Sequence, residues 1–347
     1  MEGTGVPHNL PLLWRLTSLI ALGMAVFHIY TGIFGVFESV FQRSLHIFFA
    51  LVLVFLMYAP DGRRRDVKGY KIAWFDYGLI VLVLASVGYV VLNAGTIASR
   101  YAYVTPLTGY EMLAGCVGVL LLLEATRRTM GPALPIIASV FIGYVFIGAY
   151  LPSILRHQGF SAMWTVDQLF YTTEGVWGIP AGVSSTFIVM FIIFAAFLDK
   201  SRAGDFFIRM SLAMLGKSRG GPAKAAVFAS GVMGTISGSA VANVVTTGTF
   251  TIPLMKRLGY RPVFAGAVES VASSGGQLMP PIMGAAAFII AEFTGVPYVK
   301  VALAAVIPAL LYYMSAGFMV HFEALRIGLE EIPADCYLAR EIRWALD

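Results

Sequence analysis

Residues 220–260 read GGPAKAAVFASGVMGTISGSAVANVVTTGTFTIPLMKRLGY. The stretch is mostly apolar, and basic residues stand on both sides of it. Its middle, residues 234–240, is rich in Gly and small hydroxyl residues, which are poor helix formers, whereas Pro222 suits the first turn of a helix. Irregular backbone at membrane depth is tolerated only where it is buried in protein or lines a cavity. The pattern therefore predicts a re-entrant helical hairpin over residues 222–258, with its tip near Ser237-Gly238-Ser239.

The next apolar segment, residues 262–291, is interrupted in the same way. Its centre reads Ser-Ser-Gly-Gly-Gln-Leu-Met-Pro-Pro over residues 273–281. Two glycines and two prolines in the middle of a span predict a discontinuous helix. Two broken elements in succession indicate a binding site.

Composition places these segments in a membrane protein. Of 347 residues, 58% are hydrophobic and 12% are charged, and the mean hydropathy is +0.79. Soluble domains carry about 25% charged residues. Cys116 and Cys336 lack the spacing of a disulfide scaffold or a cysteine metal site. The basic residues fall between apolar spans, so no nucleic-acid partner is expected. Composition and spans together predict an all-α polytopic membrane protein.

Lys and Arg orient the predicted spans. With a cytoplasmic N-terminus, only four of the 24 basic residues (Arg43, Arg100, Arg156 and Lys300) fall in external loops, as the positive-inside rule requires. Both termini are therefore expected in the cytoplasm, and residues 203–217 along its interface. The eight predicted spans are residues 12–36, 45–59, 73–93, 109–125, 131–151, 183–199, 262–291 and 300–321.

The two interrupted segments resemble a known family. The motif at residues 234–243, followed by Ile252-Pro253-Leu254-Met255 and Gly259-Tyr260, resembles the first hairpin of the large membrane subunits of tripartite ATP-independent periplasmic (TRAP) transporters. Residues 272–277, with Pro280-Pro281 and residues 283–288, resemble the broken helix that follows it. Within this family, the sequence of the two motifs most resembles that of the fused permeases associated with TAXI-type binding proteins.

The resemblance implies an organisation and a function. Residues 1–128 would be a four-helix region like the small subunit, residues 129–321 a transport region like the first repeat of the large subunit, and residues 322–347 a cytoplasmic tail. The implied function is that of a Na⁺-coupled permease in the inner membrane of a bacterium or archaeon. It would import an organic acid that a periplasmic TAXI-type binding protein delivers. No enzyme activity is expected, and no cofactor other than Na⁺ as the coupling ion. No Walker A pattern occurs in the sequence.

The sequence departs from the family pattern in one respect. The large subunit of the family contains two inverted repeats, each with a hairpin and a broken helix, and only the first is present here. The alternative function is therefore a truncated fragment or scaffold half, with a second chain carrying the missing repeat.

The candidate site residues come from the two breaks. Unwound carbonyls and hydroxyls offer oxygen ligands to Na⁺, and the N-termini of half-helices attract a carboxylate. By resemblance, the Na⁺ candidates are Ser237, Ser239, Ser273, Ser274 and Gly276. The full set of expected substrate- or ion-binding residues is Ser237, Gly238, Ser239, Asn243, Ser273, Ser274, Gly275, Gly276, Gln277 and Pro280.

Other interpretations stay open for these residues. The small residues of the tip can be a helix-packing motif, and the second break a simple kink. Glu269, within a span, either has a functional role or pairs with a neighbouring helix. His28, His46 and His321 are expected to be packed or interfacial. The tip also distantly resembles the serine motif of rhomboid-type proteases, but no His lies near Ser237 in the predicted spans.

Overall fold

The structure is a computed structural model that describes residues 12–65, 72–201, 203–216 and 218–329. In these ranges the chain is helical, with no strand beyond an isolated bridge between Tyr58 and Arg64. The predicted tail beyond residue 329 lies outside the described residues, as do Lys68 and Lys71 of the first basic loop. The all-α fold class is confirmed.

The chain divides into two compact units, residues 1–186 and 187–347. The predicted domain boundary at residues 128 and 129 does not coincide with this division. The helix that contains Arg128 continues to Met130. It packs against the next helix, residues 133–147, and against the short helical segments of residues 162–171. Residues 129–186 therefore cluster with the first unit by their contacts.

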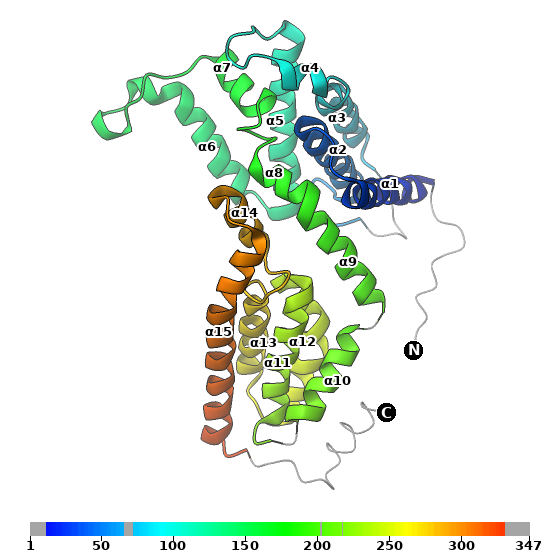
Figure 1. Cartoon of the computed structure of the whole chain (residues 1–347), viewed down its shortest axis with the longest axis vertical. Helices are drawn as coiled ribbons and strands as arrows, with labels where there is room; N and C mark the ends of the chain where they lie inside the picture. The colour runs from blue at the N-terminus through cyan, green and yellow to red at the C-terminus, as the bar shows by residue number, and fades with distance from the viewer. Residues whose placement is uncertain (1–11, 66–71, 202, 217, 330–347) are drawn as a thin grey trace. The chain divides into compact units, whose positions relative to one another are not determined.

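The first unit contains the helices of residues 12–183 (Figure 1). Helices α2 and α3 pack together, and α5 packs against both of them as well as against α6. The core between them includes Phe55, Val83, Val87 and Phe170, all fully buried. The elements are α1 (Leu12–Phe34), α2 (Ser39–Met57), α3 (Trp74–Leu92), α4 (Ala94–Ser99), α5 (Gly109–Met130), α6 (Ala133–Ile147), η2 (Gly148–Tyr150), η3 (Ser153–Leu155), α7 (Ala162–Val166), η4 (Asp167–Tyr171) and α8 (Ile179–Val183).

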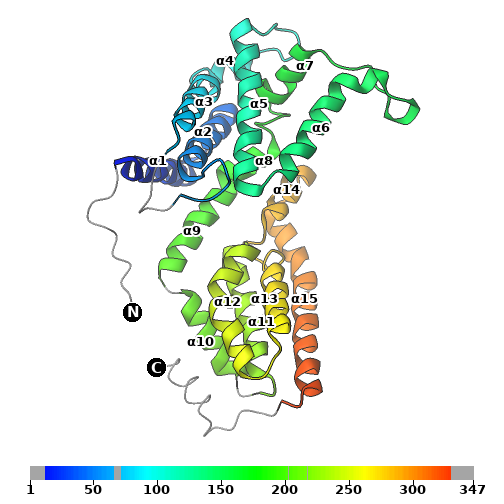
Figure 2. The ribbon, with the colours of Figure 1, turned by 180° about the vertical axis from the view of Figure 1, so that it is seen from behind.

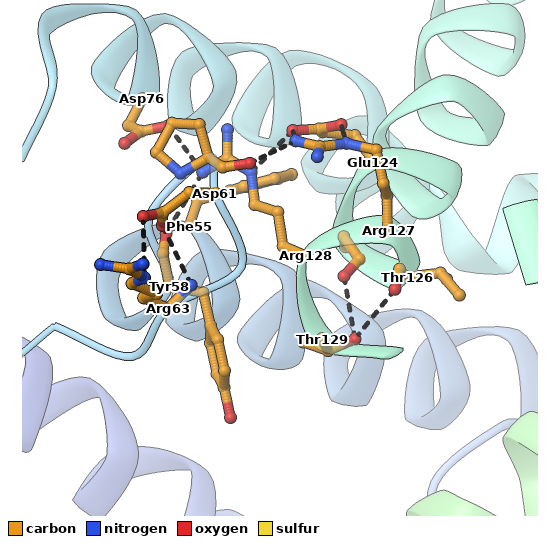
Figure 3. Close-up of polar contacts among 12 residues, drawn as sticks. Phe55, Tyr58, Asp61, Arg63, Asp76, Glu124, Thr126, Arg127, Arg128 and Thr129 are labelled. Atoms are coloured by element: carbon orange, nitrogen blue, oxygen red, sulfur yellow. Dashed lines mark hydrogen bonds and ion pairs between the residues drawn. The ribbon is translucent and has the colours of Figure 1, made fainter. Parts of the chain in front are cut away.

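A buried ionic network joins α3 to the end of α5 in this unit (Figure 3). Asp76 of α3 accepts from Arg128 at 2.7 Å and also pairs with Arg65. Arg128 is only 2% exposed, pairs with Glu124 at 2.7 Å, and lies over the ring of Phe55. The charges at the end of α5 are thus compensated inside the unit, which explains how a hydrophobic helix can continue through two arginines.

The two histidines of α1 and α2 are packed against each other. His28 Nδ1 lies 2.7 Å from the carbonyl of Met24, His28 Nε2 lies 2.9 Å from His46 Nδ1, and His46 Nε2 lies 3.0 Å from Ser184 Oγ. A carbonyl only accepts, so neutral rings form one directed chain in which Ser184 donates to His46, His46 to His28, and His28 to Met24. Both rings therefore have their polar atoms satisfied without a bound ligand.

The second unit contains the two interrupted segments. Helices α11, α12 and α13 pack against one another, α15 packs against α11 and α13, and the same grouping is visible from behind (Figure 2). Amphipathic α10 packs on α11 through Ile208 and Leu212. The elements are η5 (Ser184–Ile188), which begins in the first unit, α9 (Val189–Lys200), α10 (Ala203–Leu215), α11 (Gly221–Ser237), α12 (Ala240–Arg257), α13 (Pro262–Gly275), α14 (Ala285–Thr294) and α15 (Tyr298–Arg326).

Within the described ranges, seven helical segments are long and apolar enough to cross a membrane. They correspond to seven of the eight predicted spans, and the eighth, residues 262–291, is the interrupted pair α13 and α14. The chain is a multi-pass membrane protein. Four edges differ from the prediction by four to six residues: the second span begins at Ser39 rather than residue 45, the fourth ends at Met130 rather than residue 125, the sixth begins at Ile179 rather than residue 183, and the last ends at Arg326 rather than residue 321.

Candidate functional site

The predicted hairpin tip is the turn between α11 and α12. Helix α11 ends at Ser237, and Gly238 follows with a φ of +56°, a left-handed conformation that favours glycine. Ser239 then caps α12, its hydroxyl accepting from the amide of Ala242 at 3.3 Å. The helix break thus lies at the residues that the sequence predicted.

At the base of the hairpin, burial raises the pKa of Tyr260 to about 12, which keeps this phenol neutral.

The predicted break in the following helix is also present. Helix α13 ends at Gly275, and α14 begins only at Ala285. The connecting residues are held by short-range backbone bonds, among them Gly284 N to Gln277 O at 2.8 Å, and contain a cis peptide bond between Pro280 and Pro281. The second unit therefore has two consecutive interruptions of helix.

The two interruptions contact each other. The amide of Ile282 donates to the carbonyl of Thr235 at 3.3 Å. A Cβ atom built on Gly234 would lie 2.4 Å from the Cα of Gly276, and one built on Gly238 would lie 2.0 Å from the carbonyl oxygen of Met283. Backbone meets backbone at both places, which only glycine permits. The structure therefore brings the two predicted site segments together.

The ten predicted residues differ in their surroundings. The Ser237 hydroxyl and the Asn243 carbonyl oxygen are buried without a hydrogen-bond partner, and the Asn243 amide donates to Ser230 O at 2.7 Å. Ser273 is buried, whereas Ser274 is exposed and donates to its own helix. The others lie at the two interruptions: Gly238 and Ser239 at the tip, Gly275 as the last residue of α13, and Gly276, Gln277 and Pro280 in the break.

Helix α15 supports the end of α13 through two tyrosines. Tyr312 donates to Val271 O and Tyr313 to Ala272 O, each at 2.8 Å. The tyrosine rings also occupy the space beside Gly275, where a Cβ would lie 2.5 Å from the ring of Tyr312. Because these carbonyls lie in the last turn of α13, the tyrosines help to fix where that helix stops.

Glu269 is the centre of a buried polar cluster that sequence reasoning only partly identified. Its side chain, fully buried on α13, lies within hydrogen-bond distance of the hydroxyls of Ser230, Thr247, Thr251 and Ser273. Ser230 belongs to α11 and the two threonines belong to α12. The sequence singled out Glu269 and Ser273 but not the other three. For the two threonines the sequence offered one signal, their spacing: Asn243, Thr247 and Thr251 recur every four residues on one face of α12.

No group of three His, Cys, Asp or Glu side chains that could hold a metal ion occurs in the part of the chain that the structure describes. An apolar cavity of about 520 Å³ lies between α11 and α15, lined by residues that include Phe228, Tyr313 and His321. None of the ten predicted residues lines it. Among the described residues of this unit, oxygen atoms that suit an ion lie at the tip, in the break and around Glu269.

Part of the chain is similar in sequence to known membrane transport proteins. Residues 117–340 match the family model described as "Tripartite ATP-independent periplasmic transporter, DctM component". The C4-dicarboxylate TRAP transporter large permease protein DctM of Vibrio cholerae is 35% identical over 167 residues, which are 48% of this chain and 34% of that protein. The ectoine/5-hydroxyectoine TRAP transporter large permease protein UehC of Ruegeria pomeroyi is 26% identical over 218 residues, which are 61% of this chain and 46% of that protein.

A putative TRAP transporter large permease protein of Haemophilus influenzae is 23% identical over 220 residues, or 61% of this chain and 51% of that protein. The chain thus spans a third to a half of the length of these relatives. The family model covers both interruptions and well over half of the chain. The chain belongs to the DctM component family of tripartite ATP-independent periplasmic transporters.

Proposed function

We propose that the chain is a permease component of a Na⁺-coupled secondary transporter that imports an organic acid delivered by a periplasmic binding protein. The binding protein is of the TAXI type, residues 1–128 act as the fused small-subunit region, and the protein resides in the inner membrane with both termini in the cytoplasm. Family membership supports the transport function, and the name of the Vibrio cholerae relative supports a dicarboxylate or similar acid.

One observation carries the proposal: the tip of the α11–α12 hairpin contacts the break between α13 and α14. Broken helices present unwound carbonyls for a cation, and the N-termini of their second halves carry a partial positive charge suited to a carboxylate. Here α12 and α14 are those second halves. A substrate acid and a coupling ion can thus bind close together, which is what coupled transport requires.

The test is uptake of radiolabelled succinate into proteoliposomes that contain the purified chain and a candidate TAXI-type binding protein. An inward Na⁺ gradient should drive accumulation, and dissipating the gradient with a sodium ionophore should abolish it. Accumulation that is the same with and without the gradient would contradict Na⁺ coupling. The binding protein is omitted in a parallel arm, in which uptake should fall to background.

A second candidate function is that of a half-transporter that requires a second chain. Its support is that the described residues contain a single hairpin and a single interrupted helix. The same assay distinguishes the two. Uptake that appears only after co-expression with a chain carrying another Ser/Gly hairpin and broken helix favours the half-transporter, and uptake by this chain with its binding protein excludes it.

A further inference from the structure

The Glu269 carboxyl group is a buried acid without a basic partner among the residues that the structure describes. It is 0% exposed. In the residues that the structure describes, the recorded ion pairs of Lys and Arg involve Asp61, Asp76, Glu124, Asp167 and Glu323, and none involves Glu269. An isolated buried carboxylate is strongly unfavourable unless it is paired or hydrogen-bonded. A carboxyl group at this place therefore requires hydrogen-bond donors or a cation as partners.

Hydroxyl groups from three helices surround the carboxylate. Ser230 Oγ of α11 and Ser273 Oγ of α13 each lie 3.0 Å from Glu269 Oε1, and the Thr247 hydroxyl of α12 also contacts that oxygen. Thr251 Oγ1, one turn further along α12, lies 2.5 Å from Oε2. The cluster therefore ties the two arms of the hairpin to the first half of the interrupted helix.

The threonine hydroxyls have a second acceptor each. Thr247 Oγ1 lies 2.8 Å from Asn243 O, and Thr251 Oγ1 lies 3.0 Å from Thr247 O. When these hydroxyls donate to the backbone, their oxygen lone pairs become available inside the cluster. The same side chains can thus either hydrogen-bond the carboxylate or act as neutral oxygen ligands beside it.

Asn243 adds a carbonyl oxygen that has no partner. The side chain is 0% exposed, its amide donates to Ser230 O at 2.7 Å, and its Oδ1 is buried without a hydrogen bond. Asn243 lies one turn before Thr247 on the same face of α12, and Ser230 is shared by both. A buried oxygen acceptor without a hydrogen bond beside this cluster is available to ligate a cation.

The charge and the ligand chemistry select the ion. One carboxylate compensates one positive charge, and a divalent ion would leave an excess charge buried in the membrane. The remaining donors are hydroxyl and amide oxygens, which suit hard cations rather than transition metals. We propose that Glu269 and Asn243, with the hydroxyls of Ser230, Thr247, Thr251 and Ser273, form a Na⁺ site two turns before the break. This inference rests on the proposed Na⁺ coupling and assigns a coupling ion to the carboxylate rather than to the tip serines alone.

The test is Na⁺-dependent thermal stability of the purified full chain in detergent, with choline chloride holding the ionic strength constant. Wild-type protein should be stabilised by Na⁺ in a saturable way, because an ion that binds the folded state raises its apparent stability. Glu269→Gln, which keeps the size and a hydrogen-bond acceptor, should raise the half-saturating Na⁺ concentration at least tenfold. Glu292→Gln, the same substitution at an exposed position on α14, should leave it unchanged.

Further variants separate this inference from the proposed function. A wild-type Na⁺ response in Glu269→Gln, together with its loss in Ser237→Ala or Ser239→Ala, would overturn the Glu269 site and leave Na⁺ coupling at the tip intact. Absence of any Na⁺ response in the wild-type protein would overturn both. If Glu269→Gln does not fold, Thr251→Val serves instead, because it removes a hydroxyl oxygen that contacts Glu269 and leaves the residues of the tip and the break unchanged. A raised half-saturating concentration in Thr251→Val supports the site, and an unchanged one overturns it.

Discussion

At Gly234 and Gly276 the backbones of α11 and of the helix break touch without a side chain between them. A Cβ on Gly234 would lie 2.4 Å from the Gly276 Cα, so the two segments must separate to accept it. We expect Gly234→Ala to lower the free energy of unfolding by about 1–3 kcal/mol, the range of overpacked sites. The measurement is denaturant unfolding in detergent.

The matched control is Gly266→Ala on α13, where a new Cβ meets no atom within 4 Å. Alanine is the better helix former, so this variant should be neutral or more stable by up to about 1 kcal/mol. Equal effects of the two substitutions would show that the close approach of Gly234 and Gly276 does not contribute to stability.

Individual residues of the site were predictable to different degrees. Ser237, Gly238 and Ser239 stand out because they interrupt an apolar run, and the structure places the turn there. Ser230, Thr247 and Thr251 lie inside helices, where a hydroxyl is unremarkable in sequence. Their proximity to Glu269 depends on the packing of three helices, with partners up to 39 residues away. Where a helix is interrupted depends mainly on nearby residues, whereas this cluster forms only when three helices pack together.

The ends of elements show the same division between local and tertiary causes. Helix α2 begins at Ser39 because the Glu38 carboxylate accepts from the amides of Val40 and Phe41, a local cap that a count of hydrophobic residues does not register. Helix α5 continues to Met130 because Arg128 pairs with Asp76, 52 residues earlier. A count of hydrophobic residues ends that span too early, since it treats both arginines as solvated.

The pairing of α3 with α5 makes a prediction about that helix contact. Asp76→Ala removes the carboxylate shared by Arg65 and Arg128 and leaves buried guanidinium charge without its partner. We expect a loss of about 3–5 kcal/mol in the free energy of unfolding, as for other broken buried pairs. The control is Asp61→Ala, whose pair with Arg63 is exposed on both sides and should cost less than about 1 kcal/mol. A small effect at Asp76 would mean that α3 and α5 are held by apolar packing alone.

On the scale of the whole molecule, contacts and resemblance divide the chain differently. The boundary between the two compact units lies between Thr186 and Phe187 along the chain, whereas the resemblance divides the chain between residues 128 and 129. The family model begins at residue 117, inside α5, so neither boundary marks where the family match starts. A helix such as α5 can belong to one unit by packing while its sequence joins two regions, because packing follows the contacts of its side chains. Composition predicted the all-α fold, but contacts alone define the units.

The orientation of the chain in the membrane is the last prediction, and the hairpin makes it specific. A re-entrant hairpin requires residues before α11 and after α12 to lie on one side, and the interrupted helix then brings the start of α15 to the other. Single cysteines are introduced at exposed positions, with Cys116 and Cys336 replaced by Ser, and labelled with a membrane-impermeant maleimide. In intact cells the reagent should label Gln158→Cys and Lys300→Cys, and only after permeabilisation Arg63→Cys, Arg219→Cys and Arg261→Cys. Labelling of the Arg219 and Arg261 positions from opposite sides would mean that residues 222–258 cross the membrane, and the opposite pattern at all five positions would reverse the orientation.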